Sequence, residues 1–385
     1  MHQTDRNMTN FLKPILILGS AAALCCCSGE AGNPAEALRS RLQDAAAEGK
    51  FLYFHQDDLV YGHSWKVEDI DADPLERSDV KAVCGQFPAG VGFDLGGIEL
   101  GDEANLDSVP FALMRRAAVT QHGRGGAVTF SWHPRNPQTG GDAWDYSSDS
   151  VVGSILEGGE NHDKFMLWLS RAADFIASLK DASGTPVPVI FRPWHEHLGG
   201  WFWWGSSCCS EEEYRALYIL THDYMVNERG LRNILWAYSP NSNLSEETFL
   251  SRYPGDEYVD IIGVDHYDFL SAEAKSLGEE GIAEANAYYR EVLKKDMAVL
   301  TRLASERGKL LAVCETGFES IPDPQWWTGT LLEALQGTPV CYVLTWRNAC
   351  DKPQHFYAPF EGSADAEDFK AFCNDERTIF LTDNK

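Results

Sequence analysis

The chain has 385 residues, of which 44% are hydrophobic, and its formal net charge is −26. This length and composition are ordinary for a globular protein with one large domain or two medium ones. The negative charge argues against a polyanionic partner such as nucleic acid, because clustered Lys and Arg are needed to bind that backbone. We therefore expect neutral ligands.

Residues 1–27 predict a lipoprotein-type signal peptide. Arg6 and Lys13 precede an apolar run of roughly ten residues, shorter than the about 20 that a membrane-spanning helix needs. The end of this run, with Leu24 shortly before Cys27, resembles a bacterial lipoprotein signal, which implies that Cys27 or a neighbouring cysteine is lipidated. We therefore expect export and a membrane anchor in a Gram-negative bacterium, in the periplasm or at the cell surface. Secretion without an anchor is the alternative.

Residues 28–40 are small and polar and predict a short tether, and residues 41–385 predict one catalytic domain, since no linker sets off a second. Downstream of the signal lie Cys84, Cys208, Cys209, Cys314, Cys341, Cys350 and Cys373. An oxidising compartment permits disulfides, but the sequence leaves their pairing open. No CxxC spacing is present, so a structural zinc site is not expected.

Short apolar runs alternate with longer amphipathic stretches along the domain. The runs cover residues 50–55, 91–97, 126–133, 187–193, 233–240, 259–267, 309–316 and 340–347. Residues 161–180 and 210–229 space their apolar side chains as helices do, and Ser210 with Glu213 forms a capping-box pattern. This alternation predicts a single (β/α)₈ TIM barrel. A doubly wound open sheet is the alternative, although no G-x-G-x-x-G follows an early strand.

In such barrels the catalytic groups lie at the carboxyl ends of the strands. These predicted ends carry His55, Gln56, Asp57, Asp94, Trp132, His133, His195, Glu196, Asp265, His266, Tyr267, Glu315, Trp346 and Arg347. Polar and aromatic side chains therefore crowd one rim, where a carbohydrate site would lie.

Two glutamates stand out because each follows a strongly apolar strand: Glu196 ends the fourth and Glu315 the seventh. A retaining glycosidase needs two carboxyl groups about 5–5.5 Å apart, and an inverting one needs roughly 6.5–9.5 Å. The sequence does not supply this distance. Either glutamate alone is explained as well by a salt bridge to Arg192 or Arg347, but two of them brought close in a poorly hydrated cleft would have their pKa values pushed apart.

The stretch FRPWHEHLGGWFWWG, residues 191–205, contains four consecutive aromatic side chains at 201–204. They cannot all face one core in a regular element, and the glycines on both sides predict a loop. We expect this loop to lift Trp201 over the rim as a platform for a sugar ring, and the other three to pack.

The H-E-H sequence within this stretch offers an alternative, a metal site. Alternate residues of an extended strand share a face, which would place His195 beside His197. Zinc hydrolases use such ligands, but the helical H-E-x-x-H is absent. We therefore do not expect a metal site at these histidines.

Several segments together resemble glycoside hydrolase family 26, whose best-known members are β-mannanases. They are FHQDDLVYGHSW (54–65), FPAGVGFDLGGIE (87–99), TFSWHPRNPQTGGDAWD (129–145), FRPWHEHLGGWFWWG, IIGVDHYDF (261–269), ETGF (315–318), TWRNA (345–349) and HFYAPFEGSADAEDFKAF (355–372). The resemblance implies a retaining, double-displacement hydrolase that acts on β-1,4-linked mannans and manno-oligosaccharides without a metal or organic cofactor.

By the same resemblance, Glu196 is the acid/base and Glu315 the nucleophile. The implied substrate-binding residues are His133, His195, Trp201, Tyr267 and Trp346, and the implied supporting residues are Arg192 and Asp265. Many family members read H-E-M-N-G where this chain has His195 to Gly199, so the subsites beyond the reaction centre differ.

Three alternatives remain open at this point. They are a β-glucanase, a β-1,3-xylanase of the same family, and a lipid-anchored glycan-binding protein without activity. Internal and chain-end cleavage are also both open, because the residues 205–213 and 270–290 could each wall off a subsite.

Overall fold

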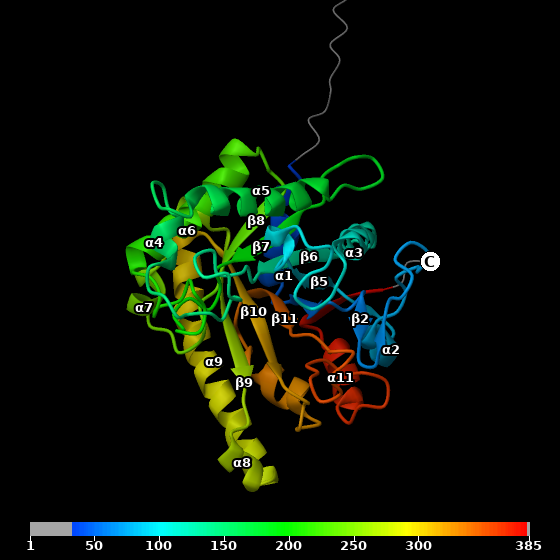
Figure 1. The fold of residues 1–385 in the computed structure, drawn as a ribbon. Coiled ribbons are helices and arrows are strands. Elements are labelled where there is room, and N and C mark those ends of the chain that lie inside the picture. The colour runs from blue at the N-terminus through cyan, green and yellow to red at the C-terminus, as the bar shows by residue number, and fades with distance from the viewer. Residues whose placement is uncertain (1–32, 383–385) are drawn as a thin grey trace, which may run out of the picture. The chain divides into compact units, whose positions relative to one another are not determined.

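The computed structural model describes residues 33–382, which form a closed barrel of parallel strands (Figure 1). The barrel strands are β1 (Phe51–Gln56), β5 (Gly90–Asp94), β6 (Ala127–Trp132), β7 (Val189–Pro193), β8 (Ile234–Tyr238), β9 (Ile261–Asp268), β10 (Leu310–Phe318) and β11 (Val340–Thr345). Each pairs in parallel with the next along the chain, and β11 pairs with β1 to close the ring. The predicted (β/α)₈ barrel is confirmed, every predicted strand is present, and the open-sheet alternative is wrong.

Helices cover the outside of the barrel (Figure 1). They are α2 (Asp79–Cys84), α3 (Phe111–Gly123), α4 (Val151–Ile155), α5 (His162–Ser178), α6 (Glu211–Asp223), α7 (Glu246–Ser251), α8 (Ala272–Ser276), α9 (Glu279–Arg307), α10 (Leu332–Ala334) and α11 (Ala366–Cys373). The predicted helices at 161–180 and 210–229 correspond to α5 and to α6, which continues as a π-helical segment, Tyr224–Glu228. Ser210 and Glu213 form the predicted capping box, which satisfies backbone N–H groups at the start of α6.

A further helix, α1 (Pro34–Ala47), closes the amino-terminal end of the barrel. Its buried residues Leu38 and Leu42 belong to the same apolar cluster as the inward-facing Leu52 and Phe54 of β1. The prediction that residues 28–40 form a tether, with the domain starting at residue 41, is therefore wrong from Pro34 onward. Asn33 caps the helix and a proline follows at its first position, a start signal that the small, polar composition of the segment obscured.

Short elements complete both ends of the barrel. Strand β12 (Thr378–Leu381) pairs in parallel with β1, at Phe51 and Leu52, and antiparallel with β4 (Phe87–Pro88). A small hairpin joins β2 (Tyr61–Gly62) to β3 (Trp65–Lys66) beyond the mouth end of β1. The last part of the described chain thus lies beside its first barrel strand.

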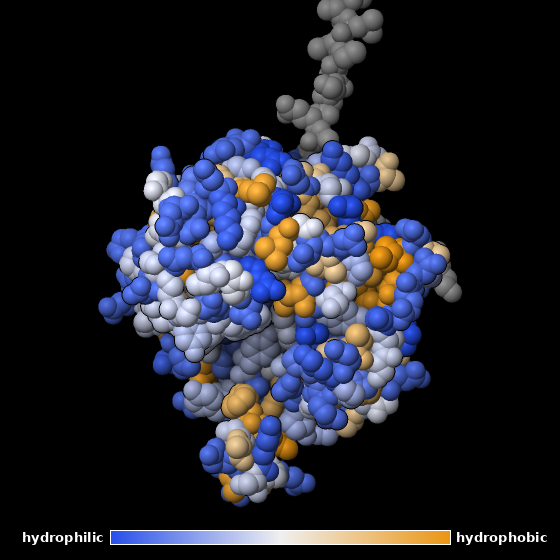
Figure 2. All heavy atoms as spheres, viewed as in Figure 1, coloured by the Kyte–Doolittle hydropathy of each residue, from blue (hydrophilic) through white to orange (hydrophobic). Residues whose placement is uncertain are grey.

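The face shown in Figure 2 is mostly hydrophilic, with hydrophobic residues in small separate groups, as the excess of acidic residues leads one to expect. Between residues 33 and 382, no helix has the length and apolar character needed to cross a bilayer. The predicted signal peptide, residues 1–27, lies outside the described residues.

Candidate active site

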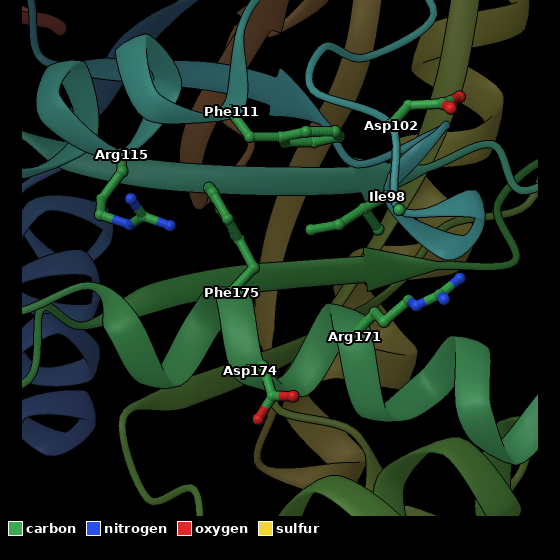
Figure 3. Close-up of a pocket in the computed structure, with 8 residues that line it drawn as sticks. Ile98, Asp102, Phe111, Arg115, Arg171, Asp174 and Phe175 are labelled. Carbon is green, nitrogen blue, oxygen red and sulfur yellow. The ribbon is translucent and has the colours of Figure 1, made fainter.

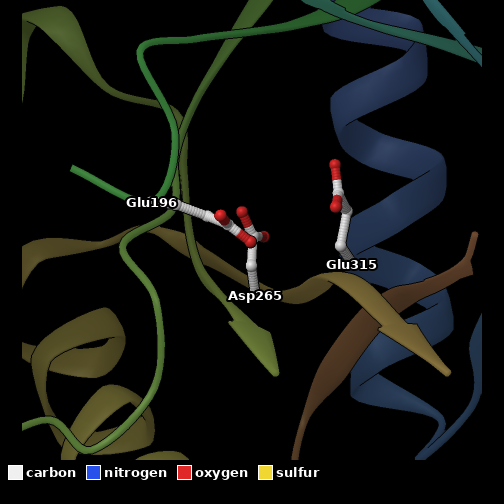
Figure 4. Close-up of side chains that lie close together, drawn as sticks. All are labelled: Glu196, Asp265 and Glu315. Carbon is white, nitrogen blue, oxygen red and sulfur yellow. The ribbon is translucent and has the colours of Figure 1, made fainter. Parts of the chain in front are cut away.

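Three carboxyl side chains converge at the carboxyl-terminal mouth of the barrel (Figure 4). Glu196 follows β7, Asp265 lies in β9 and Glu315 lies in β10, and one oxygen of each lies within 4.8 Å of the others. Arg192 of β7 donates to Glu315 Oε1 and, over 2.7 Å, to Asp265 Oδ2. Tyr267 donates its hydroxyl to Glu315 Oε2 over 2.8 Å. The fold thus brings together the residues predicted as catalytic and supporting, with one predicted to bind substrate.

A β-bulge in β10 turns Glu315 towards this mouth. The side chain of Cys314 belongs to the interior cluster of the barrel, so in a regular strand the next side chain would point outward. The register between β9 and β10 shifts between Val313 and Glu315, which is the signature of an inserted residue. Glu315 therefore also faces inward, where it meets Arg192, and Thr316 returns to the outer face.

Glu196 owes its position to a strained turn after β7. Trp194 and Glu196 have φ angles of 56° and 52°, in the left-handed region that non-glycine residues rarely adopt. Each such residue costs on the order of 1–3 kcal/mol, and such strain is common at functional sites. The Glu196 N–H donates to the Ser239 carbonyl over 2.9 Å, which ties the turn to the end of β8.

The aromatic residues around the turn hold it in this conformation. The Tyr214 hydroxyl of α6 donates to the Trp194 carbonyl, and the Trp204 indole N–H donates to the His195 carbonyl, each over 2.8 Å. The Trp194 indole in turn donates to the Thr221 hydroxyl over 3.1 Å. These backbone carbonyls accept hydrogen bonds from side chains instead of from a neighbouring strand. The turn therefore needs no strand pairing to satisfy them.

Trp201 lies at the surface and the other three aromatic residues of the run are buried, as predicted. Its side chain is 39% exposed, whereas Phe202, Trp203 and Trp204 are nearly inaccessible to solvent. Its indole N–H donates to Glu196 Oε2 over 2.8 Å. The exposed ring therefore adjoins the carboxyl pair, and its role as a sugar platform stays a prediction.

The electrostatics of the mouth separate the glutamates. Burial and the nearby Glu315 raise the pKa of Glu196 to about 7, against the opposing effect of the Trp201 hydrogen bond. Burial also raises the pKa of Asp265, although Arg192 opposes this. Glu315 accepts hydrogen bonds from both Arg192 and Tyr267. The mouth thus holds one carboxyl suited to donate a proton and one whose two oxygens are fixed by donors.

The predicted salt bridge to a glutamate also forms, with Arg192 as the partner of Glu315. Arg192 does not contact Glu196 through any recorded hydrogen bond, so its support is directed at the other glutamate and at Asp265. Three carboxylates in one cluster could hold a cation, but here the Arg192 guanidinium pairs with two of them. The cluster is therefore better suited to proton and glycosyl transfer than to metal binding.

The two histidines of H-E-H do not form a metal site. The extended strand ends at Pro193, and the turn sends the two rings in different directions. His195 Nε2 lies 3.1 Å from His133 Nε2, whereas His197 packs between Tyr214 and Tyr238, with ring centroids at 4.2 and 4.7 Å. The alternative reading therefore fails because the shared face that it requires is absent.

His133 is oriented by Asp94, which the sequence placed on the rim without a role. His133 Nδ1 lies 2.7 Å from Asp94 Oδ2, which also accepts from Ser131 over 2.6 Å. Burial opposes the charge on His133, but the Asp94 carboxylate raises its pKa. Burial lowers the pKa of His195 well below its usual value, and Arg192 and His133 act in the same direction. The pair therefore has one ring that holds a proton readily and one that stays neutral.

Trp144 is the site residue that the sequence reasoning missed. Its ring stacks on His133, with centroids 5.3 Å apart and planes within 14°, and 46% of its side chain is exposed. It lies in the long irregular segment after β6, where neither strand pattern nor spacing marks a rim residue. Its place within the segment TFSWHPRNPQTGGDAWD is the one signal that the sequence offered.

Within the described part of the chain, neither of the two remaining rim residues of the eighth strand is hydrogen-bonded to a carboxyl group of the cluster. Trp346, predicted to bind substrate, is half-buried against the interior cluster, and its backbone N–H donates to the Thr316 carbonyl. Arg347 pairs with Asp107 over 2.9 Å and donates to the Tyr61 hydroxyl over 3.3 Å. Arg347 therefore supports neither catalytic glutamate.

A cavity of about 320 Å³ on the outside of the barrel, between α3 and α5, is not part of this mouth (Figure 3). Its aromatic walls are Phe111 and Phe175. Its arginines already have partners, since Arg115 donates to Ser178 and Arg171 to the Glu99 carbonyl. Neither arginine of the cavity is therefore free to bind an anionic ligand.

Known proteins match the whole barrel. The sequence profile of Glycosyl hydrolase family 26 matches residues 51–316. A mannan endo-1,4-β-mannosidase from Bifidobacterium adolescentis is 32% identical over 84% of this chain, and one from Bacillus subtilis is 33% identical over 52% of it. The chain spans 33% and 56% of the lengths of these two relatives.

Among solved structures, a GH26 β-mannanase from Bacteroides ovatus is 43% identical to this chain. The TM-score is 0.84, and the match covers 92% of this chain and 96% of that one. The profile match extends over the strands that carry both glutamates, Arg192 and Tyr267. The chain belongs to glycosyl hydrolase family 26.

Proposed function

We propose that this protein is a retaining hydrolase of β-1,4-mannosidic linkages in mannans and manno-oligosaccharides. One observation carries the mechanism: carboxyl oxygens of Glu196 and Glu315 lie within 4.8 Å of each other. This limit on one pair of oxygens is compatible with the about 5–5.5 Å between the carboxyl groups of retaining glycosidases, and it favours that class over the roughly 6.5–9.5 Å that an inverting enzyme needs to admit a water molecule.

In the first step, Glu315 attacks the anomeric carbon and the bond to the leaving oxygen breaks. Glu196 gives its proton to that oxygen, for which a pKa of about 7 suits it. In the second step, Glu196 takes a proton from water, the water oxygen attacks the anomeric carbon, and the ester bond to Glu315 breaks. Arg192 and Tyr267 stabilise Glu315 when it leaves as a carboxylate.

The choice of mannan is supported by the relatives, which are named mannan endo-1,4-β-mannosidases and a β-mannanase. The charge of −26 is consistent with a neutral polysaccharide. Trp201 and Trp144 offer two exposed rings beside the reaction centre, on which the flat faces of sugar rings can pack. The β-glucanase, β-1,3-xylanase and glycan-binding alternatives have no comparable support.

We further propose that the protein is exported and anchored to a membrane through a lipid on Cys27, as the first 27 residues suggest. Labelled palmitate incorporated by cells that express the full chain tests this. The wild-type protein is expected to carry the label and Cys27→Ala to lose it. An unlabelled wild-type protein in the medium would contradict the anchor.

The hydrolase proposal is tested by following a linear β-1,4-manno-oligosaccharide with ¹H NMR as it is cleaved. The first new reducing end is expected as the β-anomer, which appears before mutarotation produces the α-anomer. An α-anomer that appears first would show inversion, and binding without cleavage would support the glycan-binding alternative. The same assay on mixed-linkage β-glucan and β-1,3-xylan compares substrates, and the sizes of early products on mannan distinguish internal from chain-end cutting.

A further inference from the structure

Two cysteines meet at the amino-terminal end of the barrel, far along the strands from the carboxyl cluster. Cys84 is the last residue of α2, shortly before β5 begins, and Cys373 is the last residue of α11, shortly before β12 pairs with the start of β1. Figure 1 shows α2 and α11 side by side, and these helices are in contact. The pair therefore joins the first part of the barrel to its last.

The two thiols share one neighbour and contact each other. Cys84 Sγ donates to the Gln86 carbonyl over 3.5 Å, and the Gln86 side-chain amide donates to Cys373 Sγ over 3.4 Å. The side chains of Cys84 and Cys373 also interact with each other, and this interaction is the largest influence on the pKa of each thiol. Both are free thiols in the structure.

We propose that Cys84 and Cys373 are a disulfide site, which is closed by a disulfide oxidant after export and fastens α11 and β12 to α2. The carbonyl of Gln86 and its amide fix both sulfurs on facing helix ends, and an exported chain meets an oxidising compartment. The site is independent of the proposed hydrolysis, because it lies at the opposite end of the barrel.

The order of attack follows from the surroundings of the two sulfurs. The interaction with Cys373 lowers the pKa of Cys84, and Cys84 is half-buried, whereas Cys373 is buried. The Cys84 thiolate therefore attacks one sulfur of the oxidant and releases its other half as a thiolate. Cys373 then attacks Cys84 Sγ, loses its proton and releases the second half. Two protein thiols are oxidised by two electrons, and one disulfide is reduced to two thiols.

Between residues 33 and 382, the other cysteines lack such a partner arrangement. Cys208 and Cys209 are neighbours in one loop, and Cys314 and Cys341 are buried among the barrel strands. Cys350 is half-buried, and the groups whose charges act on its thiol are Asp351, Lys66 and Arg347. None of them is a cysteine. Cys350→Ser is therefore a matched control for removing a half-buried thiol.

The purified full chain is incubated with oxidised glutathione, alkylated, digested without reductant and mapped by mass spectrometry. A linked peptide pair containing Cys84 and Cys373 is expected. The oxidised protein is expected to melt about 3–8 °C above the dithiothreitol-treated protein, because the bond closes a very long loop in the unfolded chain. Cys373→Ser and Cys84→Ser should each melt at the temperature of the reduced wild type, with or without dithiothreitol. Cys350→Ser should melt at the temperature of the oxidised wild type.

Recovery of both residues as alkylated thiols, or linked to other cysteines, would overturn the proposal. So would equal melting temperatures of the oxidised and reduced wild type. Peptide mapping needs no variant, so the test holds even if a cysteine variant fails to fold. Neither readout uses mannan, and a failure of the proposed hydrolysis would therefore be seen separately.

Discussion

At the carboxyl-terminal mouth of the barrel, Arg192 is enclosed by carboxylates and two neighbouring residues are held in left-handed conformations. At the amino-terminal end, α1 inserts Leu38 and Leu42 among the strand side chains. The same eight strands therefore end in strained, charged packing on one side and relaxed, apolar packing on the other. We therefore expect substitutions at the mouth to change turnover, and substitutions at the amino-terminal end to change the free energy of unfolding.

The largest effect is expected from the mouth. Glu315→Gln and Glu196→Gln should each lower turnover on mannan at least ~10³-fold, because they remove the nucleophile and the proton donor. The measurement is the initial rate of reducing-sugar release, with circular dichroism as the check on folding. Glu319→Gln is the control, since this exposed glutamate four positions on bonds His355 instead. Near-normal turnover of either mouth variant would remove the assignment.

The next effect is expected at the other end. Leu42→Ala should lower the free energy of unfolding by about 2–5 kcal/mol, because it leaves a cavity where α1 closes the barrel. Turnover per folded molecule should stay unchanged. Urea unfolding measures the free energy of unfolding, and active-site titration gives the turnover per folded molecule. Gln43→Ala, at an exposed neighbouring position, is the control. A large loss of turnover in folded Leu42→Ala would mean that the two ends are coupled.

A smaller effect concerns the free energy of unfolding that is lost when Glu196 is ionised at the mouth. The folded protein holds a proton on Glu196 up to a pKa of about 7, whereas the unfolded chain releases it near 4.5. Stability should therefore fall as the pH rises from 4.5 to 7, by an amount on the order of 1–3 kcal/mol. Glu196→Gln has no such proton and should unfold at higher urea than the wild type at pH 7. Equal stability of the two proteins at pH 4.5 is the internal control, and equal stability at pH 7 would refute the raised pKa.

The smallest effect is a shift of the pH profile. Because Glu196 must be protonated to start the reaction, kcat/KM should fall above a pH of about 7. Trp201→Phe keeps a ring but removes the N–H that stabilises the Glu196 carboxylate, so the alkaline limb should move to higher pH. The profile is measured on a soluble manno-oligosaccharide, with Trp144→Phe as a control that lacks a bond to Glu196. An unmoved limb would show that the indole acts only as a platform.

The amount that the sequence predicts differs between the fold and the site. Continuous apolar runs identified all the barrel strands, because parallel strands buried on both faces leave that pattern. Glu196 and Glu315 were found because each follows such a run. The helix from Pro34 was missed, since its apolar side chains are partly alanines, and Trp144 was missed, since a long irregular segment has no period to read.

Distances and directions could not be predicted. The metal-site alternative required a shared face for His195 and His197, and it fails because positive φ angles end the strand early. The pairing of Arg192 with Asp265 joins β7 to β9, which β8 separates in the sheet, so the two side chains meet only across the inside of the barrel. Local pattern therefore gives the candidates, and tertiary closure decides which of them meet.

The bulge in β10 has a consequence for anyone who redesigns this scaffold. A procedure that idealises strands would keep every residue of β10 but impose strict alternation through Cys314, in place of the shifted register that the bulge gives. Every later side chain of β10 would then exchange faces, and Glu315 would be presented to the helices. The redesigned chain would form a barrel with Glu315 on its outer face, away from the mouth. The β-bulge is therefore the part of β10 that a redesign should keep.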